Sequence, residues 1–320
     1  DAAALGRPVG VWLDREPGSA FESSRMSIAE TPPLFMGAFD NSQARIGRST
    51  LTFVDTVNGG TFQSDEMAIQ FSDPLDLQLL GEFLVRTGHL ANTGTDDDFI
   101  RDAQFWIKFS FRGPWYAAVA KWDSNRTLAC FIRDYSSGCS VNEGGTGGCP
   151  VVDVGQRFQL RLPPQRGIGD AMQLPAGTVV DLKFSGFDSF GTELSHGVRV
   201  VADEQPTEPV IVMFNPNGSI QHVYGVTNQP LSFVHLLLGD SEKVVAFVDE
   251  ARLSEDDFYA GTNIKSVENY WVSVGNLTGN VLTSENASPV ATNAGADVFN
   301  PQGVPFARQF ANAASSIGGR

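Results

Sequence analysis

The chain has 320 residues, of which 42% are hydrophobic, so it can form one large domain or two ordinary domains with buried cores. Its formal net charge of −15 argues against binding to nucleic acid, whose phosphates are contacted by Lys and Arg, and against docking to an anionic membrane surface. The 33 glycines and 17 prolines favour many turns and few long helices.

Short strand-like segments follow one another along the chain, and each is closed by turn residues, which is typical of β-rich domains. We predict strands at Val9–Leu13, Arg25–Ala29, Ser49–Val57, Met67–Phe71, Phe105–Phe111, Trp115–Lys121, Thr127–Arg133, Arg157–Leu162, Thr178–Phe184, Val198–Val201, Val210–Phe214, Ser219–Tyr224, Leu231–Leu238, Tyr270–Val274 and Asn280–Thr283.

The clearest local signal is the apolar run Val210–Phe214, which is followed by Asn215–Gly218 and a second strand. Both faces of the run are apolar, so we expect a central strand that is covered on both sides. The Asn-Pro-Asn-Gly sequence supplies the backbone preferences of a tight turn, and it predicts a hairpin. A second hairpin, with aromatic residues on both arms, is indicated at Phe105–Ala117.

Helical signals are few. Ser254–Phe258 begins with an N-cap candidate followed by acidic residues, and it predicts a short helix. Apolar residues at helical spacing, with Pro305 near the first turn, predict a C-terminal helix from about Pro305 to Ser316. The segment before it, 286–301, is rich in Ala, Asn, Thr and Gly and is expected to be an irregular linker.

Catalytic motifs are absent from the sequence, which contains no GxSxG, no HExxH and no P-loop. Asp181, Asp188 and Glu193 could pair as glycosidase acids, but any acidic chain offers such pairs. Neighbouring residues on a strand face opposite ways, so Ser195 and His196 do not form a catalytic pair there. We therefore expect a protein that is not an enzyme and has no organic cofactor.

A cation site is the one metal hypothesis that the sequence offers. Asp96, Asp97 and Asp98 follow a polar loop, and clustered carboxylates with loop carbonyls are ligands that suit Ca²⁺. The alternative is a solvated acidic loop, since the spacing is not that of an EF-hand. Zinc is not expected, because the four histidines are scattered and no CxxC pair occurs.

The three cysteines are Cys130, Cys139 and Cys149. Cys139 and Cys149 flank a glycine-rich loop, and a disulfide between them would tie this loop and indicate an oxidising compartment outside the cytoplasm. Free thiols, or a pair that involves Cys130, are the alternatives. No run of 18 or more apolar residues occurs, so no transmembrane helix is predicted. The opening Asp1–Gly6 reads like the tail of an Ala-rich helix, and we expect residues before it.

Four different strand-and-turn motifs follow one another along the chain, at Gly6–Leu13, Leu174–Leu182, Val210–Ile220 and Tyr270–Val281. In this order they resemble the globular part of minor pseudopilins and minor type IV pilins. The resemblance implies a β-rich α+β fold with antiparallel sheets, a pilin-like C-terminal core, a short N-terminal helix remnant and a C-terminal helix. It places a β-rich domain at 1–285, with a large insertion at 22–165, and a linker with the C-terminal helix at 286–320.

The same resemblance implies a non-enzymatic structural subunit of a filament in type II secretion or type IV pilus assembly. Its partners would be other pilin-like subunits or further copies of itself, at the extracellular or periplasmic face. The membrane would be reached only through a helix that is absent from this chain.

Two other functions are compatible with the residues. The first is a secreted β-sandwich module that binds carbohydrate or acts as an adhesin, with Trp115, Tyr116 and Trp122 stacking on sugars; the competing interpretation of these rings is core packing. The second is a capsid-like or sheath-like protein that assembles with itself.

Overall fold

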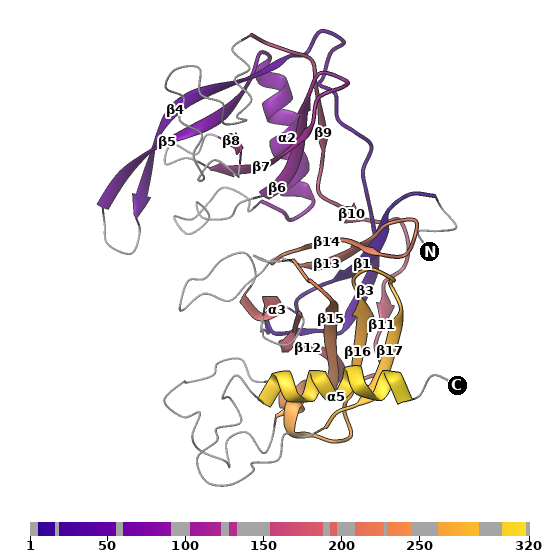
Figure 1. The fold of residues 1–320 in the computed structure, drawn as a ribbon. Helices are drawn as coiled ribbons and strands as arrows, with labels where there is room; N and C mark the ends of the chain where they lie inside the picture. Colours follow the sequence, from indigo (N-terminus) through magenta and orange to yellow (C-terminus); the bar gives the residue numbers. More distant parts are fainter. Residues whose placement is uncertain are drawn as a thin grey trace. The chain divides into compact units, whose positions relative to one another are not determined.

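The computed structural model describes residues 6–16, 19–55, 60–90, 103–122, 128–132, 154–187, 193–196, 209–226, 229–244, 262–287 and 303–317. The chain forms two compact units (Figure 1). Unit 1 comprises Asp1–Glu30 and Arg166–Arg320, and unit 2 comprises Thr31–Gln165. Each unit is described by itself below.

Unit 1 contains two antiparallel sheets. The strand order in the first sheet is β10-β3-β1-β13-β14, with β11 also paired to β3; in the second sheet it is β17-β16-β15-β12-β2. The strands of the first sheet are β1 (Val9–Leu13), β3 (Arg25–Glu30), β10 (Gln165–Arg166), β11 (Met172–Gln173), β13 (Val210–Phe214) and β14 (Ile220–Tyr224). Those of the second are β2 (Glu22–Ser23), β12 (Thr178–Phe187), β15 (Phe233–Asp240), β16 (Tyr270–Gly275) and β17 (Val281–Glu285).

The two sheets of unit 1 pack face to face as a sandwich. Their shared core joins residues of the first sheet, such as Leu13 and Val212, to residues of the second, such as Leu182 and Val234. Period-two alternation explains this, since every second side chain of each strand points into the core. The remaining residues of this core are Val180, Phe187, Leu194, Val210, Ile220, Val223, Val226 and Val274.

The other face of the second sheet is covered by helix α5 (Gly303–Ile317), which runs along it in Figure 1. Ala307 and Ala311 lie against Trp271 and Leu237 in a separate core cluster. The short elements of unit 1 are α3 (Glu193–His196) and the 3₁₀ helices η3 (Ser241–Lys243) and η5 (Asn263–Lys265). The second sheet therefore has apolar side chains on both faces, as a central layer requires.

A register shift divides β12 between Asp181 and Gly186, where it pairs with β15. Within this irregular stretch Leu182 faces the first sheet, whereas Phe184 packs in the cluster under α5. The hydroxyl of Ser185 fills the break: it donates to the Asp181 carbonyl at 2.5 Å and accepts from the Leu237 amide at 2.9 Å. A bulge of this kind re-aims the side chains of a strand.

Unit 2 is built on a third antiparallel sheet with the order β4-β5-β8-β7-β6-β9. Helix α2 (Pro74–Arg86) packs on one face, where Leu80 and Leu84 join a large core that includes Phe105 and Ile107. The strands are β4 (Ala44–Asp55), β5 (Gly60–Phe71), β6 (Ala103–Phe109), β7 (Trp115–Trp122), β8 (Leu128–Ile132) and β9 (Phe158–Arg161).

The third sheet curves until its two edges approach each other, so that it forms a half-barrel around α2. Ala44 at the start of β4 bridges to Gln156, just before β9, by two backbone hydrogen bonds of 2.8 and 2.9 Å. Phe35 forms a similar bridge to Leu160 in β9. The helix begins where the Asp73 side chain accepts a hydrogen bond from the Leu75 amide at 2.9 Å, which is an N-cap.

The predicted fold class, β-rich α+β with a pilin-like C-terminal core, is wrong. The described residues are mostly strand, in three antiparallel sheets that include a half-barrel, and no long N-terminal helix is found among them. The physical reason is that the four ordered motifs specify strands and turns, not the sheet to which each strand belongs. The proposed helix remnant at residues 1–5 lies outside the described residues.

Some predictions of individual strands and helices, in contrast to the predicted fold class, are confirmed. The hairpin is confirmed: β13 is buried, pairs with β1 and β14, and is followed by a turn in which Gly218 has φ +89°. The C-terminal helix is confirmed as α5. Helix α2 was missed. The helix predicted at Ser254–Phe258 and the strand predicted at Val198–Val201 lie outside the described residues.

Candidate binding face and cavity

The sites predicted from the sequence fall mostly outside the part of the chain that the structure describes. This holds for the calcium candidates Asp96, Asp97 and Asp98, and for the disulfide candidates Cys139 and Cys149. Within the described ranges, no group of three His, Cys, Asp or Glu side chains is placed to hold a metal ion.

The two described carboxylates that were considered as glycosidase acids are bound to backbone amides. Glu193, at the start of α3, accepts from the Phe187 amide at 2.9 Å. Asp181 accepts from the Lys183 amide at 2.9 Å and from the Phe184 amide at 3.3 Å. Both side chains thus accept hydrogen bonds from backbone N–H groups around the irregular end of β12, and in this way they stabilise the fold.

Asp181 also belongs to a buried polar cluster that centres on Asn263. The Asn263 amide donates to the Asp181 carboxylate at 2.9 Å and to the Asp240 carbonyl at 3.0 Å, and its oxygen accepts from the Asp240 amide at 2.9 Å. Asn269 donates to the same oxygen at 3.1 Å. This cluster ties η5 to the outer face of the second sheet.

The electrostatics of Asp181 follow from its complete burial. Burial raises the pKa of this carboxyl to about 6, and hydrogen bonds from Asn263 and the two backbone amides oppose the rise. The neighbouring Lys183 amine has a lowered pKa, again because of burial. The Asp181 carboxylate accepts from Asn263 and from two backbone amides, so we assign it to stability.

Unit 2 carries a different arrangement on the face of its sheet that points away from α2. Period-two alternation places Phe105, Ile107 and Phe109 of β6 in the core, and so places the intervening side chains on the opposite face. We call this surface the outer face of β7-β6-β9. Its half-buried side chains are Gln104, Trp106 and Lys108 from β6, Trp115 from β7, and Gln159 and Arg161 from β9.

The Trp115 ring is the centre of this face. Lys108, its direct cross-strand neighbour, has Nζ 4.9 Å from the ring centroid. Arg161 lies two strands away and reaches across β6, so that Cζ is 4.7 Å from the same centroid. Both distances are within the range of cation–π attraction. Trp106, opposite Arg161 in the register, adds a second indole to the surface.

The described residues of the three strands that form this face carry no negative charge. Among the described residues, β6, β7 and β9 contain no Asp or Glu, and the ion pairs seen there, Arg7–Glu30 and Arg166–Asp14, involve other residues. Lys108 also donates to the Phe111 carbonyl at 3.3 Å. In a chain with a net charge of −15, two cations held together without a carboxylate form an unusual local positive patch.

The three rings that the sequence analysis grouped as sugar-stacking candidates do not share a face. Trp115 lies on the outer face, whereas Tyr116 and Trp122 pack against the core, with Tyr116 at 6.3 Å between ring centroids from Phe109. Trp106 was missed, although its position in the alternating Phe105–Phe109 run is the signal that would have found it.

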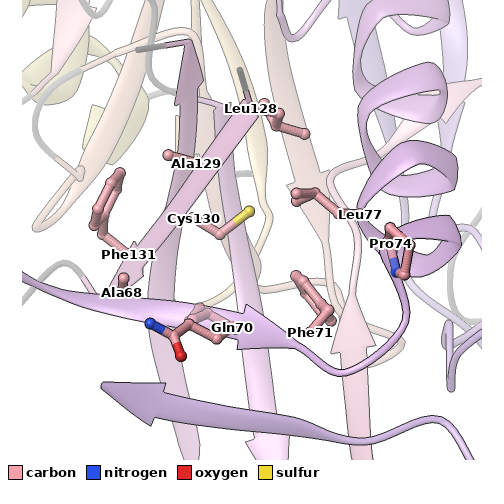
Figure 2. A pocket seen from close by; sticks show the side chains of 10 residues that line it. Ala68, Gln70, Phe71, Pro74, Leu77, Leu128, Ala129, Cys130 and Phe131 are labelled. Atoms are coloured by element: carbon pink, nitrogen blue, oxygen red, sulfur yellow. The ribbon is translucent and has the colours of Figure 1, made fainter. Parts of the chain in front are cut away.

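A cavity of about 340 Å³ lies between β5, β8 and α2 (Figure 2). Among the described residues, the two strands pair at Ala68 with Phe131. The lining is mostly apolar, with Gln70 as a polar member, and the thiol of Cys130 points towards Leu77 of α2. Burial raises the pKa of this thiol, which therefore stays protonated. Cys130 is free.

Two further findings concern the chain as a whole. None of the described helices has the length and apolar character that crossing a membrane requires. Comparison of the chain with protein-family models, with curated proteins and with solved structures finds no match.

Proposed function

We propose that this chain is a non-enzymatic binding protein that attaches to an acidic polysaccharide through the outer face of β7-β6-β9. The observation that carries the proposal is the placement of Lys108 and Arg161 over the Trp115 ring, on strands whose described residues include no Asp or Glu. This is the carbohydrate-binding alternative of the sequence analysis, now with different residues and with a charge requirement.

The chemistry of the face matches a polymer that carries carboxylate or sulfate groups along a sugar backbone. Two fixed cations bind anionic groups, and Arg in particular offers a planar fork that suits a carboxylate. Indole rings provide flat apolar surface for the C–H faces of sugar rings, and the side chains of Gln104 and Gln159 can exchange hydrogen bonds with hydroxyl groups. Neighbouring strands lie about 4.8 Å apart, so the face extends for about 10 Å across β7, β6 and β9.

Nucleic acid is the competing anionic polymer, and composition argues against it. Affinity for nucleic acid grows with the number of phosphates neutralised, and it normally requires a domain of basic character. The net charge of −15 repels every extended polyanion outside the small positive patch, acidic polysaccharide included, so this repulsion does not separate the two ligand classes, and the comparison with single-stranded DNA in the test does.

The role of filament subunit, with pilin-like partners at the extracellular or periplasmic face, stays a prediction. It assumed a pilin-like core, whereas the described part of unit 1 is a two-sheet sandwich with α5 on one side. The self-assembling capsid-like or sheath-like role is likewise a prediction. We place polysaccharide binding first because it rests on a specific arrangement of side chains.

The test is titration calorimetry of the full chain with polygalacturonate, with uncharged dextran as the neutral comparison, at low ionic strength. We expect binding to polygalacturonate alone. The double variant Lys108→Gln/Arg161→Gln should weaken it at least tenfold, and Trp106→Ala should weaken it as well. Lys243→Gln, which removes a half-buried cation of η3 in unit 1, is the matched control and should have no effect.

Three outcomes would refute the proposal. Equal binding to dextran would show that charge does not select the ligand. Unchanged binding by a double variant with a wild-type circular dichroism spectrum would remove this face as the site. Equally tight binding to single-stranded DNA would show that any polyanion suffices, and the ligand would then not be identified as a polysaccharide.

A further inference from the structure

The outer face of β7-β6-β9 continues past β9 onto residues 34–36, which we call the flanking segment. Phe35 of this segment and Leu160 of β9 form an antiparallel bridge, and they exchange two backbone hydrogen bonds of 3.0 and 2.7 Å. On the other side of β9, Leu160 lies opposite Ile107 of β6. The flanking segment therefore adds a fourth extended stretch to the face.

The register of the bridge decides which side chains stand beside the flanking segment. In an antiparallel pair the residues on either side of a bridge also lie opposite each other, so Met36 lies opposite Gln159 and Leu34 lies opposite Arg161. A contact of 3.6 Å between Gln159 Nε2 and the Met36 sulfur agrees with this register. The segment thus runs directly beside one of the two cations of the face.

The side chains of the flanking segment point to both sides of the sheet. Phe35 packs against the core, where its ring centroid lies 6.3 Å from that of Phe158. Period-two alternation in an extended stretch then directs Leu34 and Met36 to the outer face. Their side chains are 46% and 53% exposed, so two apolar groups lie at the surface beside Arg161.

The pairing registers arrange the face in two rows that run across the strands. Each strand adds about 4.8 Å, so the face with its flanking segment extends for about 14 Å in this direction. The first row is Met36, Gln159, Lys108 and Trp115, and the second is Leu34, Arg161 and Trp106. Each row therefore passes from an apolar side chain through polar or charged ones to an indole ring.

An unsubstituted acidic polysaccharide matches only part of this pattern. Its carboxylates suit Lys108 and Arg161, and its ring faces suit the indoles. Its free hydroxyl groups gain nothing from Leu34, which is a hydrocarbon, and little from Met36, whose sulfur is a weak acceptor. An acetyl ester on such a hydroxyl group presents a methyl group instead, and burying it against these two side chains removes apolar surface from water.

We propose that Leu34 and Met36 determine the specificity of this face, and that they select an acidic polysaccharide in which some hydroxyl groups are acetylated. The proposal rests on the proposed function, because Lys108 and Arg161 hold the acidic groups of the same polymer. Cross-strand neighbours lie about 5 Å apart, which is short enough for one sugar unit to reach both Arg161 and Leu34. Acetylation leaves the carboxylates in place, so the charge requirement is unchanged.

The test compares polygalacturonate with O-acetylated polygalacturonate of the same chain length, by titration calorimetry of the full chain at low ionic strength. The wild-type chain should bind the acetylated polymer about fourfold more tightly for each methyl group that becomes buried. Leu34→Gln/Met36→Gln should remove this preference and keep the affinity for unmodified polygalacturonate. Lys108→Gln/Arg161→Gln should weaken the binding of both polymers.

Ile168→Gln/Met172→Gln is the matched control, because it replaces an exposed aliphatic side chain and an exposed methionine of unit 1. It should keep the preference for the acetylated polymer. Circular dichroism of each double variant checks that its fold is retained, and the retained affinity of Leu34→Gln/Met36→Gln for polygalacturonate checks the same at the face itself.

Failure of this proposal can be told apart from failure of the proposed function. If the wild-type chain binds both polymers equally, or if Leu34→Gln/Met36→Gln keeps the preference, the acetyl specificity is overturned while polysaccharide binding stands. If the wild-type chain binds neither polymer, both are overturned. Self-association of the wild-type chain in analytical ultracentrifugation, abolished by Leu34→Gln/Met36→Gln, would assign the two side chains to a contact between copies and would overturn the proposal.

Discussion

Unit 1 and unit 2 should respond to acid in opposite directions, because burial shifts the pKa of an acidic side chain in unit 1 and of a basic side chain in unit 2. In unit 1, burial raises the pKa of Asp181 to about 6 from its usual 3.8. In unit 2, burial lowers the pKa of His89 to about 4 from its usual 6.5, opposed by a contact of 2.7 Å between Nε2 and the Pro164 carbonyl. In both cases burial disfavours the charged form.

The direction in which stability changes with pH depends on whether the folded or the unfolded state has the higher pKa. The folded form of unit 1 holds a proton on Asp181 at a pH where the unfolded chain has lost it. The contribution of Asp181 to the free energy of unfolding is therefore fully present below about pH 4 and is lost as the pH rises through 6. For His89 the unfolded chain is protonated first. The contribution of His89 to the free energy of unfolding of unit 2 is therefore present above about pH 6.5 and is lost as the pH falls through 4.

The magnitudes come from the size of the two shifts. One pKa unit corresponds to about 1.4 kcal/mol, so the full effect of either group is about 3 kcal/mol. Between pH 7 and pH 5 only part of it is realised: the free energy of unfolding rises by about 1 kcal/mol in unit 1 and falls by about 2 kcal/mol in unit 2.

Hydrogen exchange with mass spectrometry can measure the two units separately, from peptides of β12 and β15 for unit 1 and of β6 and β7 for unit 2, after correction for intrinsic exchange rates. Asp181→Asn should flatten the pH dependence of unit 1 alone, and His89→Gln that of unit 2 alone. If both units shift in the same direction, or if the slopes survive these substitutions, the assignment of the pH response to buried side chains is refuted.

Two further substitutions test the packing of unit 1, both by urea unfolding followed with the same peptides. Asn263→Ala leaves the Asp181 carboxylate and the backbone of Asp240 without their hydrogen-bond partners. Each buried group left unpaired costs about 1–3 kcal/mol, so we expect the free energy of unfolding of unit 1 to fall by about 3–6 kcal/mol. An unchanged urea midpoint would contradict this. Gly279→Ala would place Cβ 1.9 Å from the Gly218 carbonyl oxygen at φ +64°. It should therefore lower the free energy of unfolding clearly more than Gly177→Ala, because Gly177 has φ +81° but open space around it. Equal losses would show that backbone strain, and not the clash, decides the effect.

Local periodicity carried the sequence predictions that the structure confirms. Val210–Phe214 was expected to be apolar on both faces and central, and β13 lies buried between β1 and β14. Alternation in Phe105–Phe109 likewise separates core from surface side chains. In each case neighbouring residues alone decide the outcome, because side-chain direction in a strand has a period of two.

Helix α2 shows a local signal that was present and overlooked. Asp73 and Pro74 form a capped start, and Leu80 and Leu84 recur at helical spacing. The pairing of β6 with β9 is a different case, because Arg161 lies about 55 residues after its partner Trp106 and neither strand contains a signal that identifies the other as its neighbour. The predicted fold class was wrong for the same reason, because the motifs do not specify strand pairing: β1 and β13 belong to one sheet, and β12 and β16 belong to another.

The polar residues that looked most like chemistry in the sequence are those that repair the backbone of unit 1. Where β12 breaks register, the buried Arg308 of α5 donates to the Phe184 carbonyl at 2.7 Å and to the Phe187 carbonyl at 3.1 Å, while Asp181 accepts from amides on the same stretch. Groups committed in this way cannot change partners during a reaction without exposing buried backbone to an unmet hydrogen bond. The cations and the indole ring proposed to meet a ligand lie instead on the outer face of β7-β6-β9 in unit 2. Substitutions of Asp181, Asn263 or Arg308 should therefore alter stability without altering binding, whereas Lys108→Gln/Arg161→Gln should alter binding without altering stability.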